Sequence, residues 1–219
     1  MRITLLIGLL FIVAVLLVSC STEEWEEIQH TNIEGIETIV IDYRSTNVFI
    51  QPTDDDELKT ALLLYDNGPS FSLKKGNGKI NIRTKSNITR LFSIQKPSLT
   101  IRIPKNYTGE VVLKGSSGNV TGEDVQMEKL NISGSSGNVD LMFDEFMTQT
   151  TVSLSSGNVA ITVREQPDAS INFKSKSGNQ SIDFVLDEQK QTKQRTTGMI
   201  GKGTYPLQIE TTSGNVRLE

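Results

Sequence analysis

Residues 111–122 read VVLKGSSGNVTG, and residues 130–141 read LNISGSSGNVDL. The tripeptide Ser-Gly-Asn at the centre of both stretches occurs five times, and its successive glycines lie 19, 20, 21 and 36 residues apart. An apolar residue stands five positions before each of these glycines. A nearly constant period of this length predicts a repeat architecture. The glycines and asparagines of the five copies are Gly118, Asn119, Gly137, Asn138, Gly157, Asn158, Gly178, Asn179, Gly214 and Asn215.

Each copy is flanked by apolar residues at alternate positions, as in residues 159–163, VAITV, and this is the pattern of a β-strand. Glycine and asparagine both tolerate the positive φ angles that a tight corner demands. A unit of about twenty residues cannot bury its own apolar face, whereas stacked copies can. The sequence therefore predicts an all-β fold. We expect a stacked β-solenoid (β-helix-like or β-roll-like) with coils of about 20 residues, Ser-Gly-Asn corners and asparagine ladders along the stack. A row of independent antiparallel hairpins is the alternative.

The last interval between glycines exceeds the others by about fifteen residues. The excess coincides with residues 187–205, DEQKQTKQRTTGMIGKGTY, which are polar and lack alternation. We expect a solvated loop that projects from one coil, and such loops often carry binding residues. The final strand, at residues 216–219, would then form an open edge of the stack.

Weaker repeats fill residues 33–106. Residues 45–48, STNV, are a degenerate corner between two apolar stretches, and residues 76–78, GNG, are a turn signal between two further strands. Residues 99–104, LTIRIP, predict another strand that ends at a proline. Because no long helical periodicity appears after residue 20, we expect one solenoid domain over residues 33–219.

The first twenty residues, MRITLLIGLLFIVAVLLVSC, contain one basic residue followed by an apolar run, which is the pattern of a signal peptide. Residues 17–20, LVSC, resemble the bacterial lipobox, in which cleavage leaves cysteine as the first residue with diacylglycerol on its sulfur. Cys20 is the only cysteine of the chain. We therefore predict a signal peptide over residues 1–19, lipid attachment at Cys20 and an acidic tether over residues 20–32. A membrane-anchoring helix with an incidental cysteine is the alternative.

The composition excludes several classes of function. A formal net charge of −4 argues against a nucleic-acid partner, because dedicated nucleic-acid binders carry a basic excess. A single cysteine leaves neither an internal disulfide nor a cysteine-cluster zinc site. The single histidine argues against histidine-based catalysis and histidine-rich metal sites. We expect no cofactor and no metal.

Charge is unevenly distributed along the chain. Residues 21–66 carry twelve acids and two bases, whereas residues 74–105 carry nine bases and no acid. One interpretation is that neighbouring coils pair acidic with basic faces. The other is a basic outer face for anionic lipid or a wall polymer, since each Lys or Arg contributes about 1 kcal/mol near a negative membrane surface. The residues that we assign to this contact are Lys79, Arg83, Lys85, Arg90 and Arg102.

Catalytic and metal-binding patterns are weak. Residues 54–57, DDDE, could bind Ca²⁺ through carboxylates, but they lack the spacing of an EF-hand loop, so we interpret them as an exposed acidic turn. A Ser-His-Asp relay would need His30 from the tether. Glycoside cleavage needs a pair of acids, and no spacing singles one out. We predict that the protein is not an enzyme. The acids that could cluster on one face are Asp124, Asp140, Asp144, Glu145 and Asp183.

Taken in order, the signal and lipobox, the apolar strands at residues 36–41, 48–50 and 99–104, and the Ser-Gly-Asn-Val coils that end at residues 211–216 resemble a known bacterial family. This is the "putative adhesin" β-strand-repeat family, a domain of unknown function related to the toastrack domains. The resemblance covers about residues 33–219. It implies a stacked β-solenoid outside the membrane, with relatives linked to cell-envelope stress sensing and to surface attachment. The family has no established catalytic residues.

These observations predict an extracytoplasmic lipoprotein on the outer face of the bacterial cell membrane. It would act without catalysis, as a binding or scaffold module in envelope maintenance or envelope-stress signalling. Its partners would be the membrane, through Cys20, and an anionic lipid, a wall polymer or an envelope protein. A surface adhesin for an external ligand and a glycan-processing solenoid enzyme are the alternatives.

Overall fold

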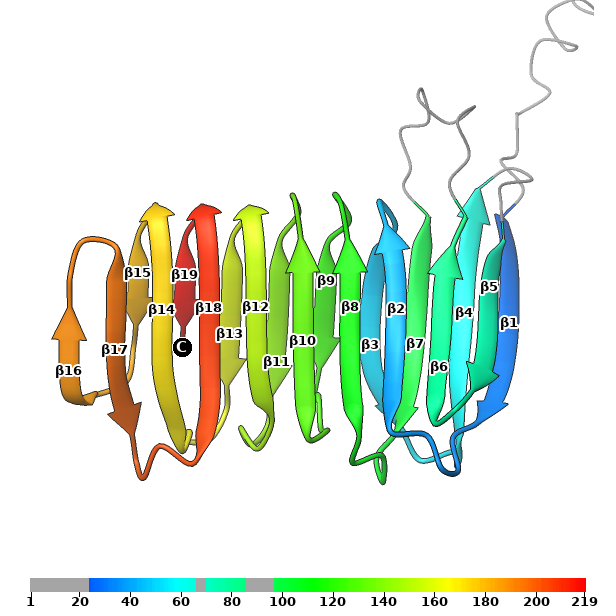
Figure 1. Cartoon of the computed structure of the whole chain (residues 1–219), viewed down its shortest axis with the longest axis horizontal. Helices are drawn as coiled ribbons and strands as arrows, with labels where there is room; N and C mark the ends of the chain where they lie inside the picture. The colour runs from blue at the N-terminus through cyan, green and yellow to red at the C-terminus, as the bar shows by residue number, and fades with distance from the viewer. Residues whose placement is uncertain (1–23, 66–69, 86–96) are drawn as a thin grey trace, which may run out of the picture.

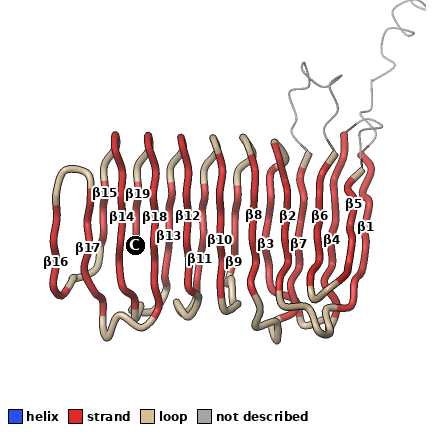
Figure 2. The backbone as a smooth tube through the Cα atoms, viewed as in Figure 1, coloured by secondary structure: helices blue, strands red, loops and turns tan. Residues whose placement is uncertain are grey.

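The computed structural model describes residues 24–65, 70–85 and 97–219, and within these ranges all regular secondary structure is β-strand. The strands form two long sheets that lie face to face (Figure 1). Loops gather along the two edges of this stack (Figure 2). The described part of the chain has no helix that is long and apolar enough to cross a membrane. The prediction of an all-β, solenoid-like fold is confirmed.

The two sheets are named A and B here. In spatial order, sheet A consists of β1 (Glu24–Asn32), β4 (Glu57–Tyr65), β7 (Ser98–Pro104), β3 (Asn47–Thr53), β9 (Val120–Glu123), β11 (Val139–Phe143), β13 (Val159–Val163), β19 (Val216–Leu218) and β15 (Gln180–Ile182). In spatial order, sheet B consists of β16 (Asp187–Gln191), β17 (Arg195–Ile200), β14 (Ala169–Ser177), β18 (Tyr205–Ser213), β12 (Gln149–Ser156), β10 (Lys129–Gly134), β8 (Glu110–Gly115), β2 (Thr38–Arg44), β6 (Lys79–Thr84) and β5 (Phe71–Gly76).

A coil of the solenoid consists of one strand of sheet B, a corner and one strand of sheet A. The coils β8–β9, β10–β11 and β12–β13 follow one another in space as they do in sequence, and their strands pair in parallel. Val139 of β11, for example, lies between Val120 of β9 and Val159 of β13. Equivalent residues of successive coils therefore stand side by side, at the ~4.8 Å spacing of paired strands.

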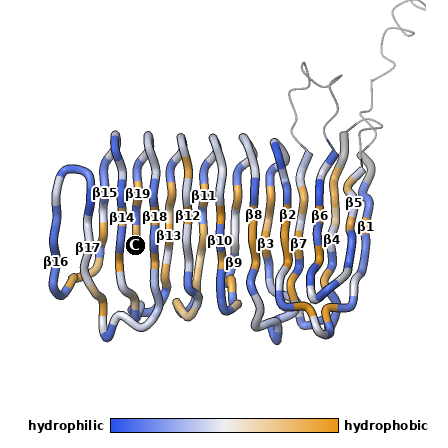
Figure 3. The backbone as a smooth tube through the Cα atoms, in the orientation of Figure 1, coloured by the Kyte–Doolittle hydropathy of each residue, from blue (hydrophilic) through white to orange (hydrophobic). Residues whose placement is uncertain are grey.

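The core lies between the two sheets and is built from every second residue of each strand. Ile39 and Ile41 of β2 are completely buried, while Val40 between them is only half-buried on the outer face. Figure 3 shows the resulting mixture of apolar stretches along the strands and polar residues at the corners. Full burial of one such aliphatic side chain contributes roughly 1.5–3 kcal/mol. The alternation of apolar and polar residues in the sequence thus determines which side chains form the core.

The order of the coils in space departs from their order in sequence at both ends of the stack. Coil β6–β7 lies outside coil β2–β3, and the C-terminal coil β18–β19 lies between coils β12–β13 and β14–β15 (Figure 1). The expectation that the last strand is an open edge is therefore wrong, because β19 pairs with β13 on one side and with β15 on the other.

Antiparallel strands finish both ends of the stack. At one end β1 pairs with β4, and β5 pairs with β6 through the predicted turn, where Asn77 and Gly78 have φ angles of 52° and 70°. Residues 24–32 therefore belong to the domain rather than to the expected tether, because their backbone continues sheet A. Residues 1–23, which hold the predicted signal peptide and Cys20, lie outside the described residues.

At the other end, residues 187–205 are not the expected loop. They form the hairpin β16–β17, and β17 pairs antiparallel with β14, so its backbone satisfies an edge that coil β14–β15 would otherwise leave open. The side chains of β16 are all exposed, which is why the sequence shows no alternation there. Thr196 and Ile200 of β17 are buried, and both are β-branched residues of the kind that favours strands.

Candidate functional site

The Ser-Gly-Asn corners stack into one ladder along the edge that is uppermost in Figure 1. In each step, the asparagine Oδ1 of one coil accepts a hydrogen bond from the backbone N–H of the next asparagine, at 2.9–3.1 Å. The ladder joins all five predicted corners to the degenerate corner of residues 45–48. In spatial order it consists of Asn47, Asn119, Asn138, Asn158, Asn215 and Asn179.

Glycine is required in these corners because the coils stack so closely. A Cβ on Gly137 would lie 2.2 Å from the carbonyl oxygen of Gly118, and a Cβ on Gly157 would lie 1.9 Å from that of Gly137. Their φ angles of 119° and 137° are a second obstacle for other residues. The corners are therefore structural, and their chemistry is already used within the stack.

The five cations predicted to contact an anionic surface do not form one patch. Lys79 and Arg83 lie on the outer face of β6, and Lys85 follows this strand, so these three residues belong to sheet B. Arg102 lies on β7 of sheet A, on the opposite face of the stack. Arg90 lies outside the described residues. Strand geometry does point Arg83 and Arg102 outward, but from different sheets.

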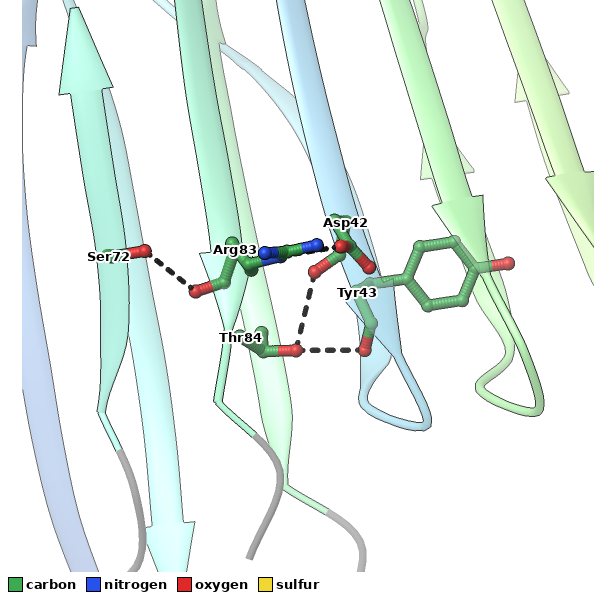
Figure 4. Close-up of polar contacts among 5 residues, drawn as sticks. All are labelled: Asp42, Tyr43, Ser72, Arg83 and Thr84. Atoms are coloured by element: carbon green, nitrogen blue, oxygen red, sulfur yellow. Dashed lines mark hydrogen bonds and ion pairs between the residues drawn. The ribbon is translucent and has the colours of Figure 1, made fainter.

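Neighbouring strands neutralise part of this charge. The Arg83 Nε donates to Asp42 Oδ2 of β2 at 2.8 Å, across the parallel pair β2–β6 (Figure 4). Thr84 Oγ1 donates to the carbonyl oxygen of Tyr43 at 3.0 Å and holds the ends of the same two strands together. Lys105 pairs with Asp54 at 2.8 Å, and this contact raises the Lys105 pKa. Acidic and basic segments of the sequence thus meet as paired strands.

A basic hairpin nevertheless remains at this end of sheet B. Residues 71–85, which span β5 and β6, contain five bases and no acid. Lys74 lies opposite Asn81 in the hairpin and shares the outer face with Arg83, and Lys79 is also exposed there. We call this element the basic hairpin. It lies at the same end of the stack as β1, where the described chain begins (Figure 1).

The five acids that could have clustered on one face lie apart in the structure. Asp140 is exposed on the outer face of β11, whereas Asp144 pairs with Arg164 at 2.9 Å, and Asp183 lies 3.8 Å from Arg217 near the far end. Asp124 lies in the turn after β9, and Glu145 lies in the turn after β11. Among the described residues no group of three or more His, Cys, Asp or Glu side chains could hold a metal ion.

The remaining acidic and histidine candidates sit at the surface near β1. In the turn of residues 54–57, Asp54 forms an ion pair with Lys105, and Asp55 accepts a hydrogen bond from the Thr53 hydroxyl. His30 of β1 lies 3.7 Å from Glu57 and is half-exposed. Among the described residues, the contacts of this region join His30 to a carboxylate and engage Asp54 and Asp55 with Lys105 and Thr53.

The outer face of sheet B is hollowed where the hairpin β16–β17 joins it. The hollow has a volume of about 450 Å³, and its floor is formed by β12, β18 and β14. We call it the polar groove. Its outward side chains are hydroxyls, amides and three charged groups: Thr151, Ser153, Asn172, Lys174, Thr192, Gln194, Arg195, Gln208 and Glu210.

Parallel pairing sets the floor of the polar groove in rows. Thr151, Gln208 and Asn172 stand side by side in one row, and Ser153, Glu210 and Lys174 stand in the next. The Lys174 Nζ contacts Glu210 Oε1 at 2.6 Å, so these two charges compensate each other. No side chain of this floor comes from a Ser-Gly-Asn corner.

The wall of the polar groove is the turn between β16 and β17. Thr192 Oγ1 accepts the backbone N–H groups of Gln194 and Arg195, and the Gln194 carbonyl accepts the N–H of Ser175 in β14. The Arg195 Nε donates to Asn172 Oδ1 at 3.1 Å, which directs the guanidinium over the floor. The turn is therefore held in place by its own hydrogen bonds and by β14.

A second and larger hollow, of about 700 Å³, lies at the opposite edge of the stack between the β1–β2 and β7–β8 connections. Its lining contains five carboxylates and one lysine, Lys129, which lies 3.5 Å from Glu128. Tyr107 is buried beneath it and donates its hydroxyl to the Glu110 carbonyl, and burial raises its pKa to about 12. The Tyr107 hydroxyl and the Lys129 ammonium group of this hollow are thus already engaged within the protein.

The chain belongs to the Toastrack family DUF4097. The family model matches twice, over residues 36–142 and over residues 123–219, and together the two matches cover the domain. The two matches overlap in residues 123–142, which run from the end of β9 through β10 into β11. No curated protein matches the sequence significantly.

Solved bacterial structures match the chain to different degrees. One is a "putative cell adhesion protein" of Clostridium sporogenes, 12% identical, with a TM-score of 0.68 over 90% of this chain and 99% of that chain. Another is a "putative adhesin" of Bacteroides fragilis, 13% identical over 90% of this chain and 99% of that chain, with a TM-score of 0.40. The first likeness supports the fold. Neither the family nor these two structures are named as enzymes.

Proposed function

We propose that the protein is an extracytoplasmic lipoprotein whose toastrack domain binds without catalysis, in cell-envelope maintenance or envelope-stress signalling. The observation that carries the proposal is the start of β1 at Glu24, only four positions after Cys20. Four Cα–Cα steps reach at most about 15 Å. A lipid on Cys20 would therefore hold the β1 end of the stack close to the outer face of the bacterial membrane.

The basic hairpin supports this orientation. It lies beside the β1 end, and it presents Lys74, Lys79 and Arg83 on the outer face of sheet B. Near an anionic membrane each such cation contributes about 1 kcal/mol. The acyl chains would supply the anchor, and the hairpin would orient the stack against anionic headgroups.

Cys20→Ser tests the anchor. We expect the wild-type chain in the membrane fraction, with a mass that has lost residues 1–19 and gained acyl chains at Cys20. The Cys20→Ser variant should keep residues 1–19 and gain no acyl mass. Ser19→Ala, which keeps a small residue at the cleavage position, is the matched control and should be processed normally. A wild-type chain that retains residues 1–19 without acylation would instead indicate a membrane-anchoring helix.

Charge reversal tests the orientation. Lys74→Glu together with Lys79→Glu should weaken binding of the unacylated domain to vesicles that contain anionic lipid, at low salt, by at least tenfold. Lys190→Glu on β16, at the other end of the stack, should leave this binding nearly unchanged. Equal binding of the unacylated wild-type domain to neutral and anionic vesicles would contradict a role for the basic hairpin.

Adhesion to an external ligand is the second candidate function. The polar groove favours it, because the groove lies toward the end of the stack that is farthest from β1. With nine strands in sheet A at ~4.8 Å each, the two ends are separated by roughly 40 Å. A domain anchored at β1 would therefore hold the groove away from the membrane. Binding of the purified protein to host cells or matrix, abolished by changes in the groove, would favour adhesion over an envelope role.

A further inference from the structure

We propose that the polar groove is a binding site for an acidic saccharide, a hydroxyl-rich chain that carries a carboxylate or phosphate. This inference rests on the proposed binding function and names the class of ligand. In the groove, the inserted hairpin β16–β17 rises beside the flat outer face of sheet B and makes a hollow. The repeat motif did not predict the residues of the groove, because these residues lie on strand faces and in the hairpin turn rather than in the corners.

The floor suits hydroxyl groups. Thr151, Gln208 and Asn172 offer a hydroxyl and two carboxamides in one row across three strands. Hydroxyls and carboxamides both donate and accept hydrogen bonds, as sugar hydroxyls do. The row advances by ~4.8 Å per strand, and such spacing allows successive groups of one sugar chain to meet successive strands.

The charge of the groove favours an anion. Lys174 and Glu210 compensate each other at 2.6 Å, and this leaves Arg195 as the uncompensated charge of the lining. Within the described residues no carboxylate lies within ion-pair distance of Arg195, and its Nε is fixed by Asn172. A guanidinium held by Nε can still present its two terminal nitrogens to a carboxylate or phosphate in a bidentate contact.

The groove is also organised before any ligand arrives. Thr192 accepts two backbone N–H groups of its own turn, and Ser175 of β14 fixes the turn to the sheet. A preformed wall lowers the entropic cost of binding. The three observations together point to a small anionic sugar segment rather than to a flat protein partner, because the hollow holds only about 450 Å³.

Binding of defined oligomers to the full chain in detergent tests the proposal. Oligogalacturonate offers carboxylates, and oligomeric glycerol phosphate offers phosphates, so that the two probes distinguish the two sources of the anion. Neutral galactose oligomers are the uncharged comparison. We expect one anionic probe to bind at least tenfold more tightly than the neutral one at low salt, with affinity falling as salt rises.

Two variants locate the site. Arg195→Gln should weaken binding of the anionic probe at least tenfold. Ser153→Glu, which places a carboxylate on the floor without touching the hairpin, should abolish it. Lys190→Gln, on the same hairpin but outside the lining, is the matched control and should bind normally. Failure of both anionic probes, equal binding of the neutral oligomer, or unchanged binding by both groove variants would overturn the proposal. Acylation of Cys20 is measured separately, so these outcomes leave the test of the anchor untouched.

Discussion

The middle of the stack and its two ends are built by different rules. In the middle, parallel coils repeat in register, and each corner rests on the corner of its neighbour. At the ends, antiparallel strands such as β1 and the hairpin β16–β17 extend the sheets without any corner. The corner motif therefore depends on a neighbouring coil, rather than on the turn alone.

Two corners depart from the motif, and both support its dependence on a neighbouring coil. Thr46 occupies the glycine position in coil β2–β3, and the next coil outward, β6–β7, has no Ser-Gly-Asn sequence. Gln180 replaces the valine that follows asparagine elsewhere, and it lies on β15, the edge of sheet A. In both cases the motif residue is replaced at a corner that lies at an end of the stack of corners.

The largest effect is expected from a methyl group in a central corner. In Gly157→Ala the new Cβ would lie 1.9 Å from the Gly137 carbonyl oxygen, and the φ of 137° disfavours alanine as well. We expect a loss of at least about 3 kcal/mol in the free energy of unfolding, measured by urea titration.

Gly76→Ala is the matched control at the end of the stack. Gly76 lies in the basic hairpin, where an added Cβ would have no atom within 4 Å, and its φ is not positive. Its substitution should change the free energy of unfolding by less than about 1 kcal/mol in either direction. Similar losses in the two variants would mean that close corner stacking is not what selects glycine.

A smaller effect is expected when one rung of the asparagine ladder is removed. Asn138→Ala deprives the Asn158 N–H of its acceptor at 3.0 Å, which should cost about 1 kcal/mol. Asn179 is the last asparagine of the ladder, where no further coil donates to it within the described structure. Asn179→Ala should therefore cost less than Asn138→Ala. Urea titrations of both variants measure the difference. Equal losses in the free energy of unfolding would mean that the hydrogen bond to the next coil is not what stabilises the ladder.

How much of this could be predicted from sequence depends on which interactions are local. The strands and corners follow from alternation and from the fixed spacing of Ser-Gly-Asn, and even the weak corner at Asn47 joins the ladder. The position of β18 between β12 and β14 could not be predicted, because all coils carry the same corner and any order of stacking satisfies it. The contact of Arg83 with Asp42 depends on such an arrangement, and so does the polar groove, whose floor combines residues from β12, β14 and β18.

At the edge of sheet A, a stabilising change is expected. The side-chain amide atoms of Gln180 are buried and have no hydrogen-bond partner in the described structure. Gln180→Val restores the residue found in the other coils, as in Val216 beside it, and removes two unsatisfied polar atoms. We expect a gain of about 1 kcal/mol in the free energy of unfolding. A loss of stability would show that the amide has a role at this end that the repeat does not require.

The smallest effect concerns the turn at which the chain leaves the end hairpin and enters the inserted coil β18–β19. Asp168 accepts hydrogen bonds from the Thr204 hydroxyl at 2.6 Å and from the backbone N–H groups of Thr204 and Lys202. These bonds favour the carboxylate and lower the Asp168 pKa, the Thr204 hydroxyl most strongly.

A carboxyl whose pKa is lower in the folded chain stabilises the fold above its unfolded pKa of about 3.9, and this contribution is lost as the pH falls through the folded value. Asp168→Asn should therefore be less stable than the wild type at pH 6, and the difference should shrink as the pH falls below about 4. Because Asp168 sits where an end element returns into the middle of the stack, a pH-independent difference would mean that the turn is fixed by its glycines, and that the inserted coil is placed by strand pairing alone.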